Sequence, residues 1–190
     1  MALLAPFARP FALRLRGDDA RPPAACSPLV PPFDTAPSPA SSEAKGSRTE
    51  VACFLAHALL TDSAHVRAVV AELESSIDAD VVVWSPCLST ASRAELLVAL
   101  LDGDDAITDV EVSIVGTSTS ASSVLVEWRL EGRFNNAGFL NDDLLVEPSG
   151  GMVEATGVLV VVFDGDRATR IRCYYDSLGL LEQVIRPTDP

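Results

Sequence analysis

The sequence predicts an α+β domain, in which helices come first and a mainly antiparallel sheet follows. Two observations lead to this prediction. Three segments between residues 49 and 101 carry apolar residues at helical spacing, whereas the segments after residue 108 alternate apolar and polar residues. Helices followed by a series of long strands are typical of α+β folds, and not of alternating folds with a parallel sheet.

Residues 1–49 differ in composition from the rest of the chain. They hold nine of the 13 prolines and show no sustained apolar periodicity, so we expect a disordered leader. In its first residues, MALLAPFARPFALRLR, prolines interrupt the apolar part and arginines lie within and after it, which argues against a secretory signal. This order fits a transit peptide for an organelle, with a plastid as the expected one, although three aspartates before residue 35 argue against it. The alternatives are an organellar protein or a cytoplasmic one with a disordered tail; secretion is not expected.

Residues 50–186 are the predicted domain, and its first part contains three helices. Glu50 to Leu60 is expected to be helical, with Thr49 as N-cap and an apolar face of Val51, Phe54, Leu55, Ala58 and Leu59. A second helix, His65 to Ser76, follows Asp62 or Ser63 as its cap and carries Val66, Val69, Val70 and Leu73 as its stripe. Ser89 or Thr90 is the expected cap of a third helix, Ala91 to Leu101, with a core face of Ala94, Leu97, Val98 and Leu101.

The strands are predicted from β-branched runs and from alternation. Val81 to Trp84 is a short strand that Pro86 ends, and Asp109 to Gly116 alternates, with Val110, Val112 and Ile114 on one face. A Ser/Thr-rich connector, Thr117 to Ser123, leads to the cleanest pattern in the chain. Between Val124 and Phe134 the core face is Val124, Val126, Trp128, Leu130 and Phe134, and the other face is mostly charged.

The C-terminal third completes the sheet. Asn135 to Glu147 is predicted to be a loop, and residues 148–151 a turn into the next strand. Val153 to Phe163 is apolar on both faces near its end, so we expect it to be a central strand. A tight turn at residues 164–166, a last strand and a short helix follow.

Charge and cysteine usage exclude several classes of function. The chain has a formal net charge of −13, and residues 50–190 hold 23 acidic residues against eight basic ones. Such a domain repels phosphate backbones and anionic lipids, so neither nucleic-acid nor membrane binding is expected. None of the four cysteines forms a CxxC pair, so we expect free thiols and no metal site.

Five segments, taken together and in order, resemble the SnoaL-like branch of the nuclear transport factor 2-like superfamily. They are VVVWSP, VLVEWRLEGRF, EPSGGMVEATG, FDGDR and YYDSLGLLEQ. The branch contains polyketide cyclases and ketosteroid isomerase-like proteins. The resemblance implies a cone-like fold, in which the sheet curls around the helices and forms a pocket for a small apolar molecule.

The resemblance also implies a candidate catalytic residue, Asp176. In SnoaL-type cyclases a carboxylate near the end of the last strand acts as acid and base, and an apolar pocket raises the pKa of such a group. The alternative is that Asp176 caps the helix that follows it. The cyclases also use a histidine on the preceding strand, whereas Val153 to Phe163 contains none. This departure weakens the expectation of cyclase activity.

Trp84, Trp128, Tyr174 and Tyr175 are the candidate ligand-binding residues. The tryptophans can line the pocket or belong to the core, and one of the two tyrosines can donate a hydrogen bond to a ligand oxygen; alternation alone does not decide which one points inward. We expect a small hydrophobic ligand, no cofactor, and, if the protein is an enzyme, isomerase- or cyclase-like proton chemistry. The competing hypothesis is a non-catalytic interaction module that forms a homodimer through the outer face of the sheet.

Overall fold

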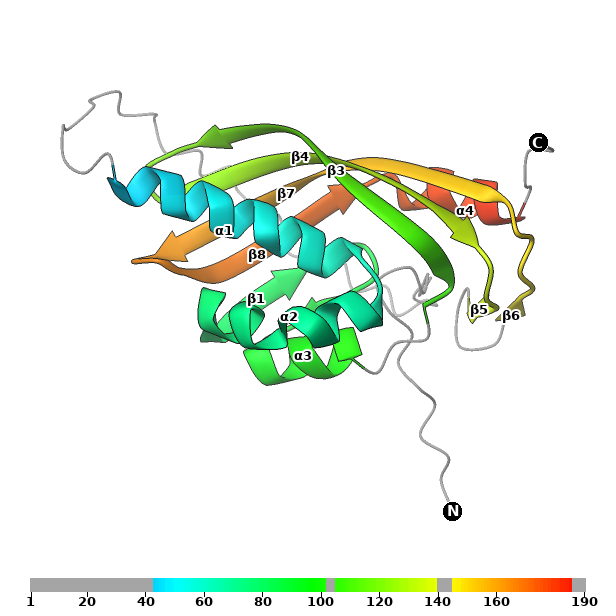
Figure 1. The fold of residues 1–190 in the computed structure, drawn as a ribbon, viewed down its shortest axis with the longest axis horizontal. Coiled ribbons are helices and arrows are strands. Elements are labelled where there is room, and N and C mark those ends of the chain that lie inside the picture. The colour runs from blue at the N-terminus through cyan, green and yellow to red at the C-terminus, as the bar shows by residue number, and fades with distance from the viewer. Residues whose placement is uncertain (1–42, 102–104, 140–144, 186–190) are drawn as a thin grey trace, which may run out of the picture.

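Four helices and a six-stranded sheet form the main body of the computed structural model, which describes residues 43–101, 105–139 and 145–185 (Figure 1). The helices are α1 (Glu43–Leu60), α2 (Ser63–Ser76), α3 (Arg93–Leu101) and α4 (Ser177–Ile185). The strands are β1 (Ile77–Trp84), β2 (Ser89–Thr90), β3 (Ile107–Thr119), β4 (Ser123–Phe134), β5 (Gly138–Phe139), β6 (Leu145–Val146), β7 (Met152–Asp164) and β8 (Arg167–Tyr175). Helices precede the long strands, so the predicted α+β class is confirmed.

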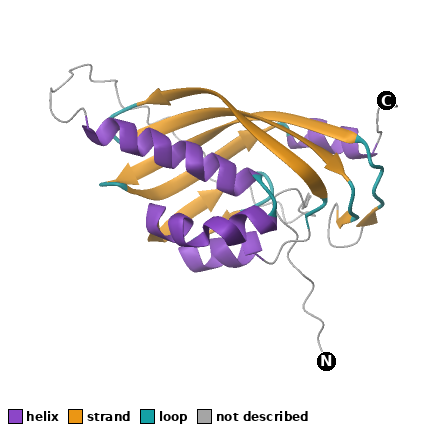
Figure 2. Ribbon diagram, in the orientation of Figure 1, coloured by secondary structure: helices purple, strands orange, loops and turns teal. Residues whose placement is uncertain are grey.

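The six-stranded sheet has the order β2-β1-β8-β7-β4-β3, and β5 and β6 form a separate two-stranded sheet. All pairs are antiparallel except β1 with β8, which is parallel. The long strands β3, β4 and β7 arch over α1, and α1, α2 and α3 lie on the same side of the sheet (Figure 2). This arrangement leaves the opposite side of the main sheet as an outer face, and it agrees with the expected helix-covered, curved sheet.

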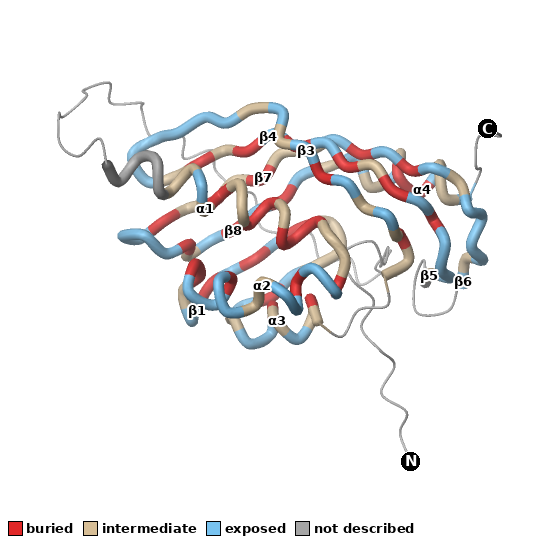
Figure 3. Tube along the Cα trace, in the orientation of Figure 1, coloured by how far each residue is buried: buried red, intermediate tan, exposed pale blue. Residues whose placement is uncertain are grey.

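The core lies between the sheet and the three N-terminal helices (Figure 3). The predicted face of β4 is confirmed, because Val124, Val126, Trp128, Leu130 and Phe134 are all buried. The charged residues Glu127, Arg129 and Arg133 on its other face are exposed. Burying one face of each long strand provides the apolar area that stabilises the domain.

Two capping predictions were wrong. Thr49 is not an N-cap, because α1 begins six residues earlier, at Glu43. Ser89 and Thr90 do not cap α3; they pair with β1 as strand β2, and Ser92 instead accepts a hydrogen bond from the Glu95 amide at 3.2 Å. By contrast, Asp62, one of the two predicted caps, is the N-cap of α2, and its side chain accepts a hydrogen bond from the His65 amide at 2.8 Å.

The predicted core face of α3 was also wrong in part. Leu96 and Leu100 are the buried residues, whereas Val98 is 54% exposed and Ala94 is exposed. Leu97 and Leu101 pack at the edge of the core. The segment RAELLVALL is apolar around most of its circumference, so periodicity cannot select one face, and packing against β1 selects it.

Two connections are shorter than predicted. Thr117 to Thr119 extend β3 and pair with β4, so the expected connector shrinks to residues 120–122. Threonine has a high strand propensity, and the pairing of β4 continues as far as these residues. The expected loop Asn135 to Glu147 contains the short strands β5 and β6; residues 140–144 within it lie outside the described part.

Candidate functional site

The four aromatic candidates fall into two pairs on opposite sides of the sheet. Trp128 and Tyr175 lie on the helix-covered side, with ring centroids 6.0 Å apart in an edge-on arrangement. Trp84 and Tyr174 lie on the outer face, with centroids 5.4 Å apart, and are 43% and 44% exposed. The predicted set is therefore divided between an interior cluster and an outer groove.

The interior cluster consists of Trp128, Tyr175, Cys87 and Cys173. Tyr175 ends β8, and its hydroxyl shares a hydrogen bond of 3.0 Å with the Cys87 sulfur, which follows β1. Cys173 is buried two residues before Tyr175 on the same face of β8. The sequence predicts free thiols, and no motif links Cys87 to Tyr175, because 88 residues separate them.

A glycine allows the Trp128 indole to reach this cluster. Register places Trp128 on β4 beside Gly157 on β7, and Gly157 beside Tyr175 on β8. A Cβ atom at Gly157 would collide with the indole ring and with the Tyr174 carbonyl oxygen. The missing side chain therefore leaves the space through which the indole extends toward Tyr175.

The Trp128 N–H is the unusual polar group of this cluster. Trp128 is 1% exposed, and its Nε1 atom has no acceptor at hydrogen-bonding geometry among the described residues. The Cys173 thiol is its polar neighbour, and the N–H acts to lower the pKa of that thiol, against the larger effect of burial. A buried donor without a full hydrogen bond is rare in native proteins, and leaving it unsatisfied costs about 1–3 kcal/mol.

The ionisable groups of the cluster are held neutral. Burial raises the pKa of Cys173 to about 12. Burial also raises the pKa of Cys87, an effect that the hydrogen bond from Tyr175 partly offsets. The pKa of Tyr175 is raised by burial first and by the neighbouring thiols second. The cluster therefore offers neutral donors and no charge at neutral pH.

Asp176 lies directly after β8 and is exposed. Its carboxylate accepts a hydrogen bond from the Gly179 amide at 2.9 Å, and its carbonyl accepts from Leu180, so it caps α4. This is the alternative that the sequence left open. Its catalytic role remains a prediction.

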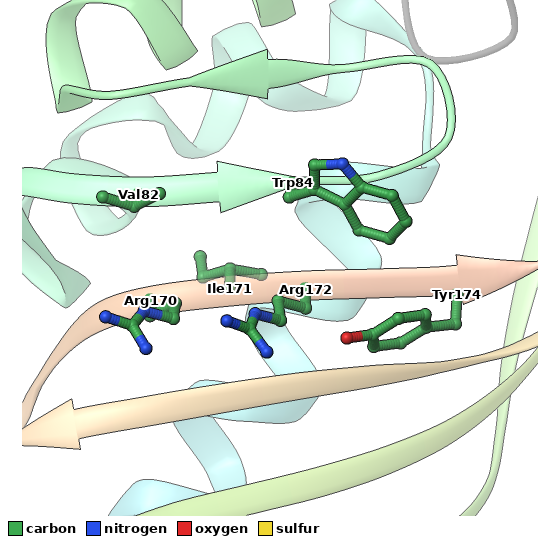
Figure 4. Close-up of a pocket in the computed structure, with 6 residues that line it drawn as sticks. All are labelled: Val82, Trp84, Arg170, Ile171, Arg172 and Tyr174. Carbon is green, nitrogen blue, oxygen red and sulfur yellow. The ribbon is translucent and has the colours of Figure 1, made fainter. Parts of the chain in front are cut away.

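The outer groove has a volume of about 500 Å³ and lies between β1 and β8 (Figure 4). Its outward side chains are Val82 and Trp84 from β1 and Arg170, Arg172 and Tyr174 from β8. A second depression, of about 440 Å³, lies between the β6 region and α4. The described residues contain no cluster of three or more His, Cys, Asp or Glu side chains that could hold a metal ion.

No family model matches the sequence, and no curated protein matches it either. Solved structures do match. A protein described as a SnoaL-like polyketide cyclase from Jannaschia sp. CCS1 superposes with a TM-score of 0.63 at 14% identity, over 80% of this chain and 100% of that one. IdmH, described as a polyketide cyclase from Streptomyces antibioticus, matches with a TM-score of 0.56 at 15% identity, over 72% and 97%. TerC, crystallised with polyporic acid, matches with a TM-score of 0.52 at 14% identity, over 73% and 98%.

The chain has the SnoaL-like fold of the nuclear transport factor 2-like superfamily. The resemblance that the five sequence segments carry is thus confirmed at the level of fold. In this SnoaL-like domain the interior cluster lies on the side of the sheet that the helices cover. None of the described helices is both long and apolar enough to cross a membrane.

Proposed function

We propose that this SnoaL-like protein binds a small, mostly apolar molecule on the helix-covered side of the sheet, and that an oxygen of the ligand accepts a hydrogen bond from Trp128. The observation that carries the proposal is the buried indole N–H without an acceptor. A donor in this position gains most from a ligand oxygen, because no water competes for a fully desolvated partner.

The neutral cluster indicates the chemistry of the ligand. Tyr175 and the two thiols are uncharged donors and weak acceptors, and their pKa values are raised by burial. A carbonyl or enol oxygen suits such a site better than a carboxylate, whose charge would be desolvated without compensation. TerC, a protein of the same fold, was crystallised with polyporic acid, which supports a small-molecule ligand for this fold.

Calorimetric titration with 1-tetralone, a neutral aromatic ketone, tests the proposal, because the chain offers matched variants. Tyr175→Phe and Trp128→Phe each remove one donor from the interior cluster, and we expect either change to weaken binding by about threefold to tenfold, the value of one hydrogen bond. Trp84→Phe and Tyr174→Phe are the controls, since they alter the outer pair. Circular dichroism checks that each variant is folded.

Two outcomes would contradict this proposal. If the interior variants bind 1-tetralone as tightly as the unaltered protein, the indole N–H is not a ligand donor. If the titration shows no heat for 1-tetralone, a bound water satisfies the N–H and the site is structural.

Proton transfer is the reaction class that such a site would perform, with no cofactor. A neutral Tyr175 hydroxyl can stabilise an enolate oxygen while a carboxylate moves the proton at the adjacent carbon. Asp176 is the candidate carboxylate that the resemblance implies. Its hydrogen bond to the Gly179 amide and its exposure mean that it has to turn away from α4 to reach a ligand. A turnover assay of Asp176→Asn against the unaltered protein tests this role.

A non-catalytic dimerisation module is the second candidate. The outward side of β7 carries the half-buried residues Val158, Val160 and Val162, and Val82 and Val115 on the same sheet are 44% and 66% exposed. A second copy would cover this apolar band. Sedimentation velocity should then show twice the chain mass of 20.1 kDa, and Val160→Lys should yield the monomer. A monomer for the unaltered chain at high concentration would rule the module out.

A further inference from the structure

The outer groove contains two arginines that no group in the described part of the chain neutralises. Arg67 and Arg93 donate to backbone carbonyls, Arg133 donates to Gly150, and Arg129 pairs with two glutamates. Arg170 and Arg172, by contrast, have neither a hydrogen bond nor an ion pair with any residue that the structure describes. This is unexpected in residues 50–190, where acidic residues outnumber basic ones by 23 to eight.

Strand geometry brings the two positive charges together. Arg170 and Arg172 alternate with buried Ile171, so both point outward, roughly 7 Å apart along β8. Their guanidinium groups lie side by side and point the same way, and the Tyr174 hydroxyl points toward Arg172 (Figure 4). Like charges at this spacing repel each other, and an anion that contacts both groups would remove this repulsion.

The aromatic pair provides an apolar wall beside these charges. Parallel pairing of β1 with β8 sets Trp84 beside Arg172 and Val82 beside Arg170. Trp84 and Tyr174 are inclined at 50°, and each leaves more than two fifths of its surface exposed. A groove of about 500 Å³ is within the size range of small-molecule sites.

We propose that the outer groove is a site for a small planar aromatic carboxylate. The carboxylate lies between Arg170 and Arg172 and accepts hydrogen bonds from both guanidinium groups and from the Tyr174 hydroxyl. The aromatic ring of the ligand packs on Trp84, where the indole offers a flat apolar surface. This site lies on the face of the sheet opposite to the interior cluster, and it prefers an anion where the interior prefers a neutral oxygen.

A second copy of the chain fits this groove less well. A two-fold interface presents the same patch to itself, so two copies would bring four guanidinium groups toward one another. A small anion avoids this repulsion, because it contacts only one pair of arginines.

Titration with 2-naphthoate, followed by calorimetry and by the NMR signal of the Trp84 indole, tests the proposal. We expect saturable binding that shifts the Trp84 signal and leaves the Trp128 signal unchanged. Arg172→Gln or Arg170→Gln should weaken binding about tenfold or more, the value of a hydrogen bond to a charged group. Arg167→Gln is the matched control, because Arg167 is an exposed arginine on the same strand outside the groove, and it should bind as the unaltered protein does.

Neutral 2-naphthamide separates charge recognition from apolar packing and should bind about tenfold more weakly than 2-naphthoate. Equal affinity for the two compounds would overturn the proposal. An equal loss of 2-naphthoate affinity in the Arg167→Gln and Arg172→Gln variants would also overturn it. No binding of 2-naphthoate, together with a Trp84 signal that broadens with protein concentration, would assign the groove to self-association instead. Loss of 1-tetralone binding in the Tyr175→Phe variant does not bear on this site, so the two proposals fail independently.

Discussion

At the scale of single residues, Gly157 decides the shape of the interior cluster. It lies in one row between Trp128 and Tyr175, and its missing side chain leaves room for the indole. Glycine within a strand usually weakens it, because the residue has no side chain to pack and loses more chain entropy on folding. At Gly157 the Trp128 ring fills the space that a side chain would occupy.

Gly157→Ala should therefore destabilise the fold by about 1–3 kcal/mol, the usual cost of overpacking a core. The added methyl group would meet both the indole and the backbone of β8, so neither neighbour can yield freely. Urea unfolding measures the change. Gly116→Ala is the control, since its Cβ would meet only the flexible Glu127 side chain at 3.4 Å, and it should cost much less. Similar costs for both variants would contradict the proposed fit.

The buried thiol Cys173 makes the folded protein less stable as the pH rises into the alkaline range. Its pKa is raised from 9.0 to about 12 in the folded protein, so the unfolded chain releases its proton first as the pH rises. The stability that this thiol contributes is complete below pH 9 and is lost between pH 9 and pH 12. We expect a loss of about 1 kcal/mol from this group between pH 8 and pH 10, measured by urea unfolding. Cys173→Ala should show a smaller loss over that interval; an equal loss would contradict the argument.

At the scale of secondary-structure elements, Asp176 couples the last strand to α4. Its carboxylate holds the Gly179 amide at 2.9 Å, and a Cβ atom at Gly179 would approach that carboxylate within 2.7 Å. Asp176→Ala should cost about 1 kcal/mol in thermal or urea unfolding, whereas Asp176→Asn should cost a few tenths, because asparagine also caps helices. Unchanged stability of the alanine variant would mean that the cap contributes little.

Helix α3 shows how packing selects a face that the sequence leaves open. Leu96 is fully buried and Val98 is 54% exposed, although both belong to one apolar run. Leu96→Ala should cost about 2–5 kcal/mol, the range for a large side chain removed from a core. Val98→Ala should change the unfolding free energy by less than about 0.5 kcal/mol, because the site is on the surface. A larger loss of unfolding free energy for Val98→Ala than for Leu96→Ala would show that α3 is rotated about its axis.

At the scale of the whole molecule, α1 packs along the long strands of the sheet. It contacts β4, β3 and β7 from beneath the sheet. Near its start, Arg48 donates to the Ala121 carbonyl at 3.0 Å, in the turn between β3 and β4, and lies 5.9 Å over the Phe163 ring. The helix therefore begins to pack on the sheet before residue 50.

The predicted leader can be tested by truncation. Residues 1–42 lie outside the described part, so the disordered leader and its plastid address remain predictions. A chain that begins at Arg48 should melt at the same temperature as the full chain, because it keeps the Arg48 contacts. A chain that begins at Glu50 loses these contacts and should melt several degrees lower. A melting temperature several degrees lower for the chain that begins at Arg48, measured by calorimetry, would show that the leader packs on the domain.

Local patterns alone determined the fold class, the order of the long strands along the chain and the buried face of β4. A period of two places Trp128 in the core whatever its neighbours are, because only one face of that strand is apolar. The resemblance of the last strand and helix to SnoaL-like proteins also predicted the fold correctly. Turns and strand ends are local features, so a short segment of sequence can identify them.

Tertiary structure alone decided which candidates meet. Tyr174 and Tyr175 are adjacent in sequence and chemically alike, and only the register of β8 in the sheet turns Tyr175 inward and Tyr174 outward. Cys87 reaches Tyr175 across 88 residues, and Trp84 reaches Arg172 through a parallel pairing. No local pattern specifies such long-range pairs, because their geometry depends on how distant strands align. The sequence therefore supplied the residues of both sites, and packing divided them between the two faces of the sheet.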